Sequence, residues 1–211
     1  MNIKVRNVNS PNWKLLTVQS QMPQSLKCLD EMAHNLWWTW NADAFNLFSN
    51  LNHDLFKSCN QNVIEMLGLL SYEELTMMSE DNALLYKINE VYSQFRNYMD
   101  QKPDASRPSV SYFCMEYGLN HFLKIYSGGL GILAGDYLKQ ASDSNVNLVG
   151  VGLLYRYGYF TQELAMDGSQ IAKYEAQDFE RLPINKVMDG DKQMVIDVPF
   201  PGYTLHALVW R

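Results

Sequence analysis

The feature that most restricts the fold of this 211-residue chain is a pair of apolar segments with a helix-forming segment between them. Val110–Phe113 is a short apolar run, and Leu148–Tyr155 is a continuous apolar run of strand length. Between them, six residues share one face at helical spacing: Leu130, Leu133, Ala134, Tyr137, Leu138 and Ala141. A continuous apolar strand is typical of a parallel sheet that is buried on both faces. The order strand, helix, strand therefore predicts part of a doubly wound α/β sheet.

Residues 1–101 carry helical patterns instead of strand patterns. Six apolar residues recur at spacings of three and four and predict one helix: Leu26, Leu29, Ala33, Leu36, Trp37 and Trp40. A second helix is expected over Ala42–Leu51, and the capping-box pair Ser71 and Glu74 predicts the start of a third. An apolar stripe predicts a long helix over Leu84–Tyr98. We therefore expect a helical N-terminal module.

The polar segment 102–109 is the expected linker, because its two prolines disfavour helix in the residues before them. Residues 110–211 are then a partial α/β domain with an antiparallel β extension. Asp189-Gly190 and Pro201-Gly202 are turn signals between short alternating strands. The chain stops at Arg211 inside such an alternation, which favours its interpretation as part of a longer protein.

Charge and composition argue against several classes of function. The net charge of −6 and the scattered Lys and Arg residues disfavour nucleic-acid binding. No apolar run approaches the roughly 20 residues of a membrane-spanning helix, and Met1–Trp13 has no apolar core of a secretory signal. The odd number of cysteines, without CxxC spacing, indicates reduced thiols and a cytoplasmic location. The four histidines are too dispersed to predict a metal site.

The sharpest candidate for a binding site is the glycine-rich sequence SGGLG, Ser127–Gly131, at the start of the predicted helix. Glycines there let a ligand approach the backbone, and the free amides of a first helical turn favour an anion, most often phosphate. The alternative interpretation is that these glycines only permit a tight turn and close helix packing. Residue pattern alone leaves both interpretations open.

Two other phosphate motifs fit this turn less well. A P-loop requires a lysine that follows the glycines at fixed spacing, and none stands there. Gly129, Gly131 and Ala134 satisfy the dinucleotide pattern GxGxxA, but about fifteen residues separate Phe113 from Gly129. The second predicted strand also lacks the expected carboxylate. A nicotinamide site is therefore not favoured.

Four segments, in this order, resemble the α-glucan (glycogen or maltodextrin) phosphorylases of the short bacterial and archaeal type. They are HNLWWTWN (34–41), YFCMEYG (112–118), IYSGGLGILAGD (125–136) and LVGVGLLYRYGYFTQ (148–162). The resemblance runs from about residue 20 to the end of the chain and identifies it with the N-terminal portion of such an enzyme. Gly118 and Arg156 follow the short type, so the allosteric regulation of the long animal type is not expected.

The resemblance implies a retaining glycosyltransferase with two facing Rossmann-like domains. Such enzymes use inorganic phosphate to release glucose 1-phosphate from α-1,4-glucans such as glycogen, starch and maltodextrin. Their cofactor is pyridoxal phosphate, whose phosphate group takes part in acid-base exchange with the substrate phosphate. For the full-length enzyme, a homo-oligomer is one option. The chain alone would be inactive, because the Schiff-base lysine and the basic residues that hold the phosphates would lie outside it.

The resemblance also assigns roles to residues of this chain. The backbone amides of Gly128, Gly129, Leu130 and Gly131 would lie at the phosphate and the reacting sugar, where fixed donors stabilise developing charge. Gly129 would also lie near the cofactor phosphate. Glu116 would be a catalytic residue in the neighbouring loop, or it would only cap backbone amides there.

The three neighbouring tryptophans suggest stacking on sugar rings, but their spacing favours another interpretation. Trp37 and Trp40 are expected in the helical core, and Trp38 is expected to contact the rest of the enzyme. Two other function classes stay open. A glycogen or starch synthase also carries a GGLG turn, although Tyr126 stands where synthases usually have lysine. The second open class is a glucan-binding protein without catalytic activity.

Overall fold

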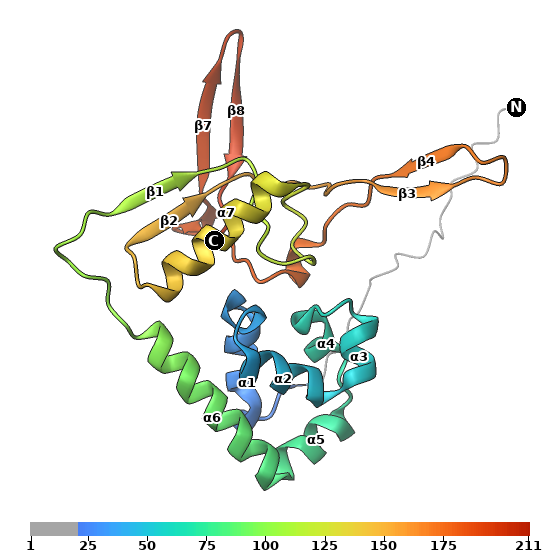
Figure 1. Cartoon of the computed structure of the whole chain (residues 1–211), viewed down its shortest axis with the longest axis vertical. Coiled ribbons are helices and arrows are strands. Elements are labelled where there is room, and N and C mark those ends of the chain that lie inside the picture. The colour runs from blue at the N-terminus through green and yellow to red at the C-terminus, as the bar shows by residue number, and fades with distance from the viewer. Residues whose placement is uncertain (1–20) are drawn as a thin grey trace, which may run out of the picture.

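The computed structural model describes residues 21–211, which form a helical part and a mixed α/β part in contact with each other (Figure 1). The helical part contains α1 (Lys27–Ala33), α2 (Ala42–Leu51), α3 (His53–Ser58), α4 (Val63–Leu69), α5 (Tyr72–Glu80) and α6 (Asn82–Met99), with 3-10 turns η1 (Gln24–Leu26) and η2 (Leu36–Thr39). The mixed part begins with β1 (Val110–Phe113), α7 (Gly129–Asp143) and β2 (Leu148–Val151). It continues with β3 (Thr161–Leu164), β4 (Gln170–Lys173), η3 (Phe179–Arg181), β5 (Met188–Asp189), β6 (Lys192–Gln193), β7 (Val195–Phe200) and β8 (Tyr203–Leu208).

Side-chain caps set several of the helix boundaries. The predicted capping box is confirmed at α5, where Ser71 Oγ accepts the Glu74 amide at 3.2 Å and the Glu74 carboxylate accepts the Ser71 amide at 2.8 Å. The Asp81 carboxylate accepts two amides of the first turn of α6. α2 has the predicted bounds and is capped by Asn41. These caps satisfy amides that have no partner within the helix.

The single helix predicted from Leu26 to Trp40 is wrong. α1 ends at Ala33, and Asn35 has extended backbone with φ −121° and ψ 133°. The Asn35 side chain accepts the amide of Trp37 at 2.9 Å and so starts the turn η2. Asparagine competes with helix continuation through such local hydrogen bonds. The apolar spacing runs across the break because residues on both sides of it enter the same core.

Trp38 contacts a residue outside the helical part, as predicted, and it does so from the centre of the helical core. It is 1% exposed, and its ring stacks on that of Phe122 with centroids 6.1 Å apart. Trp37 is buried as predicted, whereas Trp40 is partly exposed and donates Nε1–H to Asp143 Oδ1 at 3.1 Å. The break at Asn35 changes the direction of the backbone, so helical spacing no longer decides which tryptophan points inward.

The loop between β1 and α7 fills the core of the helical part. Phe122 and Leu123 from this loop are 9% and 4% exposed and belong to the same apolar cluster as Trp38. A more distant segment also contributes, since Asn62 Nδ2 donates to the Arg181 carbonyl at 2.8 Å. The two parts therefore share one core and are not joined only through the polar segment 102–109.

The predicted strand, helix, strand unit is confirmed. β1 and β2 pair in parallel, with Val110 opposite Leu148 and Phe113 opposite Val151. β2 is shorter than the apolar run and ends before Gly152. The expected burial of this strand on both faces is wrong for residues 21–211, since β1 and β2 are largely exposed. This sheet has only two strands, and the single helix α7 covers only one of its faces (Figure 1).

α7 approaches the rest of the fold through its small residues. Gly131, Ala134, Gly135 and Ala141 are buried. The larger residues predicted to face the core are mostly exposed: Leu130, Leu133 and Tyr137. A Cβ atom added to Gly135 would lie 2.3 Å from the Gly118 carbonyl oxygen. Such close contact between α7 and the loop after β1 requires glycine at this position. Because the small residues of α7 face that loop, its larger residues point outward.

The C-terminal region is antiparallel, as predicted. Gly190 and Gly202 take φ of +59° and +87°, in the left-handed region that favours glycine, at the β5–β6 and β7–β8 turns. The β3–β4 hairpin around Gly168 was not predicted, although Asp167-Gly168 is a turn signal of the same kind. In Figure 1 the β3–β4 and β7–β8 hairpins project away from the rest of the chain.

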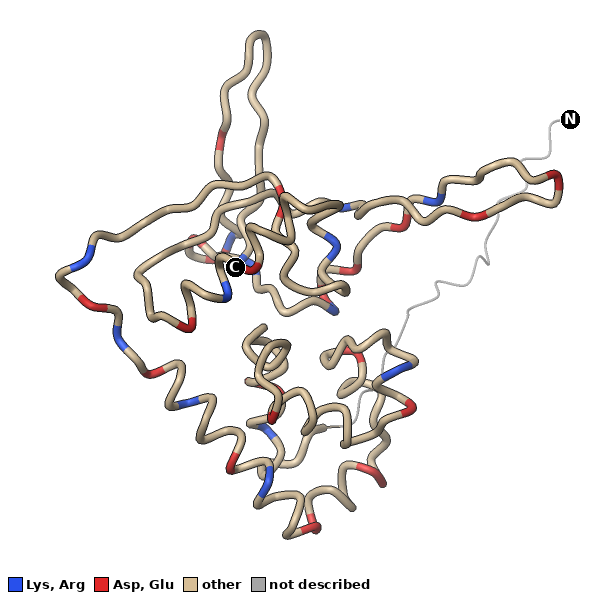
Figure 2. Tube along the Cα trace, in the orientation of Figure 1, with Lys and Arg blue, Asp and Glu red and all other residues tan. Residues whose placement is uncertain are grey.

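Other features of the described residues concern charge, metals and thiols. Acidic and basic residues are scattered along the trace of residues 21–211 in Figure 2. Within residues 21–211, no helix is both long and apolar enough to cross a membrane, and no three potential metal-binding side chains lie together. The cysteines form no disulfide with one another. Burial raises the pKa of the Cys28 and Cys59 thiols above the ordinary value.

Because Phe122 completes the helical core, we expect Phe122→Ala to destabilise the chain by about 3 kcal/mol, the cost typical of a large-to-small change in a packed core. The matched control is Phe113→Ala, which removes a ring that is 72% exposed and should change stability little. Urea unfolding followed by tryptophan fluorescence measures both. Equal stability of the two variants would contradict the shared core.

Candidate functional site

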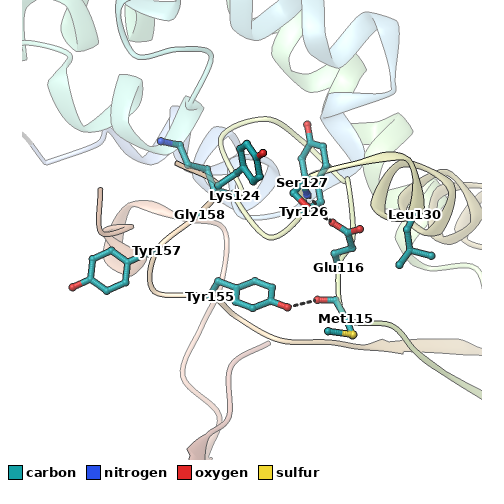
Figure 3. A pocket seen from close by; sticks show the side chains of 10 residues that line it. Met115, Glu116, Lys124, Tyr126, Ser127, Leu130, Tyr155, Tyr157 and Gly158 are labelled. Carbon is teal, nitrogen blue, oxygen red and sulfur yellow. Dashed lines mark hydrogen bonds between the residues drawn. The ribbon is translucent and has the colours of Figure 1, made fainter. Parts of the chain in front are cut away.

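A cleft of about 340 Å³ lies where the carboxyl ends of β1 and β2 meet the N-terminus of α7 (Figure 3). Three segments line it. They are Met115 and Glu116 after β1, Lys124, Tyr126, Ser127 and Leu130 before and at the start of α7, and Tyr155 and Tyr157–Tyr159 after β2. In α/β folds, ligands bind outside the carboxyl ends of parallel strands. The structure therefore brings the predicted glycine turn and Glu116 together at the edge where a ligand site is expected.

Glu116 is held against the glycine turn. Its Oε2 accepts the Ser127 amide at 2.6 Å and the Ser127 hydroxyl at 3.3 Å (Figure 3). The contact shapes the backbone immediately before α7, as the capping interpretation of Glu116 describes. The other oxygen, Oε1, has no hydrogen-bond partner among residues 21–211.

The glycines of the turn divide into two kinds. Gly131 is buried, and a Cβ added to it would lie 2.6 Å from the Cβ of Tyr126. Its carbonyl also accepts the Gly118 amide at 2.7 Å, so it serves close packing. Gly128 and Gly129 have nothing within 4 Å of such a Cβ, and neither has positive φ. Packing thus accounts for Gly131, while open space surrounds the other two.

The first turn of α7 presents unpaired amides. Gly128, the N-cap residue, has an extended backbone and no side chain to accept a hydrogen bond. The amides of Gly129 and Leu130 have no acceptor among residues 21–211. In a helix of 15 residues these amides carry the positive end of the dipole. Unpaired amides at a helix N-terminus have the chemistry that suits an anion, and they lie beside the cleft.

Two tyrosines that sequence reasoning missed connect the segments after β1 and after β2. Tyr117 Oη donates to the Tyr112 carbonyl at 2.5 Å and lies 3.3 Å from the Val151 carbonyl, so it joins the ends of β1 and β2. Burial raises the pKa of Tyr117, which keeps the hydroxyl neutral and able to donate. Tyr155 Oη donates to the Met115 carbonyl at 3.0 Å (Figure 3).

Gln177 is a further residue of the site that sequence reasoning missed. Its Nε2 donates to the Tyr155 carbonyl at 2.6 Å and to the Lys124 carbonyl at 3.2 Å. Its Oε1 accepts the Lys124 amide at 2.9 Å. One side chain, far along the chain, thus holds both the loop before α7 and the segment after β2. A lone glutamine in a polar stretch carries no sequence signal for such a role.

The division among the glycines predicts opposite effects of the same substitution. Gly131→Ala should destabilise the chain by about 1–3 kcal/mol, because the added methyl group overpacks a full site. Gly129→Ala, the matched control, should leave stability unchanged or raise it by up to about 1 kcal/mol, since alanine favours helix over glycine. Thermal unfolding by circular dichroism measures both. A destabilising Gly129→Ala would show that this residue also serves packing.

The sequence of this chain is similar to those of several known proteins. Residues 22–123 match a family described as "Protein of unknown function (DUF3417)". The chain is 36% identical to a maltodextrin phosphorylase of Thermococcus litoralis over 90% of the chain and 24% of that protein. It is 34% identical to a glycogen phosphorylase of Mycobacterium tuberculosis over 92% of the chain and 24% of that protein.

A glycogen phosphorylase of Aquifex aeolicus is 40% identical over 76% of the chain and 23% of that protein. The chain thus spans about a quarter of the length of the curated relatives that it matches. The matched DUF3417 region runs through the predicted linker and ends at Leu123, inside the loop that fills the helical core. On these similarities, the chain resembles an N-terminal portion of glycogen and maltodextrin phosphorylases.

Proposed function

We propose that this chain forms part of an α-glucan phosphorylase, in which inorganic phosphate attacks the terminal unit of an α-1,4-glucan and glucose 1-phosphate is released. The observation that carries the proposal is the first turn of α7, where the Gly129 and Leu130 amides have no acceptor among residues 21–211, at the carboxyl edge of the β1–β2 pair. Fixed amides there suit an oxyanion, because they need no rearrangement as charge develops.

The same amides fit the phosphate group of pyridoxal phosphate. They offer unpaired N–H donors at the positive end of a helix dipole, and an added Cβ at Gly129 would have nothing within 4 Å. When bound, the cofactor's phosphate supplies acid-base exchange with the substrate phosphate. Glu116 would keep the turn in shape by holding the Ser127 amide. We assign the Schiff-base lysine and the phosphate-binding cations to residues outside this chain.

For the domain organisation, we propose a helical module over residues 1–101, a linker over 102–109 and a partial Rossmann-like domain over 110–211. Because Phe122 lies in the helical core, the module and the domain would move as one body during the reaction.

We further propose a cytoplasmic enzyme, with a homo-oligomer as an option for its full-length form. A glucan-binding protein without activity is the second candidate, and the first experiment below separates the two.

The 211-residue chain alone should produce no glucose 1-phosphate when incubated with pyridoxal phosphate, inorganic phosphate and maltodextrin. The reason is that α7 offers amides for a phosphate, while the groups that bind the cofactor covalently are assigned elsewhere. A coupled assay for glucose 1-phosphate measures this, and a full-length protein containing these residues is the positive control. Activity of the chain alone would contradict the assignment of the lysine and the phosphate-binding cations to residues outside it. An inactive full-length protein would favour a glucan-binding protein without activity.

In a full-length protein, Gly129→Val should lower turnover by roughly a hundredfold or more, because loss of one oriented donor at a developing charge costs about 3 kcal/mol. The β-branched side chain would occupy the space through which a phosphate reaches the amides. The control is Gly68→Val on α4, a helical glycine that also has open space around its Cβ but lies outside the cleft. Turnover of Gly129→Val within about twofold of the parent would exclude the phosphate role.

A further inference from the structure

A second cleft, of about 360 Å³, lies where the C-terminal end of α6 meets η2 and the C-terminal end of α7. It shares no lining residue with the cleft at the glycine turn. Three aromatic residues, four amides and one carboxylate line it: Trp37, Trp40, Tyr98, Asn41, Gln94, Asn97, Gln101 and Asp143. We call this surface the amide cleft.

The carboxylate of the amide cleft is held in place by the aromatic residues. Asp143 Oδ1 accepts Trp40 Nε1–H at 3.1 Å and Tyr98 Oη–H at 2.8 Å. Burial raises the pKa of Tyr98 to about 12, so its hydroxyl stays neutral at physiological pH. The second oxygen, Oδ2, has no hydrogen-bond partner among residues 21–211 and is left to accept one from a ligand.

Gln94 donates to Asp43 Oδ2 at 3.1 Å, but the other three amides are available to a ligand. Asn97 and Gln101 are exposed, and their side chains make no hydrogen bond within residues 21–211. Asn41 uses its carbonyl oxygen to cap α2, which leaves its NH₂ group. The cleft therefore offers both donors and acceptors at fixed positions beside aromatic rings.

This set of groups selects one class of ligand. No lysine or arginine lines the cleft, and Asp143 would repel an anion. A single carboxylate surrounded by aromatic rings and amides suits neither a metal ion nor a purely apolar molecule. A pyranose satisfies every group: its hydroxyls both donate and accept hydrogen bonds with amides and a carboxylate, and its C–H face packs on an aromatic ring.

We propose that the amide cleft binds a neutral oligosaccharide, a segment of α-1,4-glucan, at a site separate from the cleft at the glycine turn. The choice of an α-glucan rests on the proposed function, while the choice of a neutral sugar rests on the lining residues alone. Such a site would hold a distant part of the polymer on the helical part of the chain and raise the local concentration of chain ends.

The test is titration of the ¹⁵N-labelled 211-residue chain with maltoheptaose, followed by NMR. Saturable shifts are expected for the indole N–H of Trp40, and none for that of Trp210, which lies outside the cleft. The double variant Asn97→Ala, Gln101→Ala should weaken binding about tenfold, the effect of losing two hydrogen bonds of ordinary strength. Asn89→Ala, an exposed asparagine on the same helix but outside the cleft, should bind like the parent chain.

Several results would overturn the proposal. They are no shift of the Trp40 indole at millimolar maltoheptaose, equal binding of cellohexaose, or unchanged affinity in the double variant. Thermal unfolding of each variant accompanies the titration, and since both replaced side chains are exposed, no loss of stability is expected. If that double variant is unstable, Gln101→Ala alone provides the comparison.

The outcomes for the two clefts can be told apart. Gly129→Val should leave maltoheptaose binding unchanged, because it alters only the cleft at the glycine turn. Loss of the sugar in Gly129→Val would place it at that cleft and refute the amide cleft. Failure of phosphorolysis in the full-length protein, with sugar binding intact here, would refute the proposed function and leave the amide cleft standing.

Discussion

The stacking of Phe122 on Trp38 is the contact on which the rest of the structure depends. The helical part has a core that its own residues do not complete, and the loop after β1 enters it with Phe122 and Leu123. That insertion fixes the middle of the long connection between β1 and α7. The glycine turn follows within a few residues, so the position of the candidate site depends on helical packing some distance away in the sequence.

Close approach of backbones is the second constraint. Gly118, Gly131 and Gly135 let α7 rest directly on the loop after β1, where any Cβ would collide. This contact leaves Gly128 and Gly129 at the front of the helix with their amides free. Packing and binding are therefore divided between neighbouring glycines of one motif. The two interpretations of the motif apply to different residues of it.

Local signals account for much of what sequence analysis predicted correctly. The capping box at Ser71, the bounds of α2, the parallel strand pair and the Asp189-Gly190 and Pro201-Gly202 hairpins all arise from interactions between residues close in sequence or from simple periodicity. The errors concern Asn35, which ends a helix by a hydrogen bond that apolar spacing does not reveal, and Trp40, which is only partly buried after that break.

The sequence by itself determined the order of elements, the location of a glycine turn at a helix start and the resemblance to a known family, because each is written in a short stretch of neighbouring residues. Only the tertiary structure decided that Gly131 packs while Gly129 stays open, that Glu116 holds the Ser127 amide, and that Gln177 joins two distant segments. It also decided that Trp40, Tyr98 and Asp143 meet in one cleft. The geometry of these contacts follows from packing, which no local pattern encodes, and several of them join residues far apart in the chain.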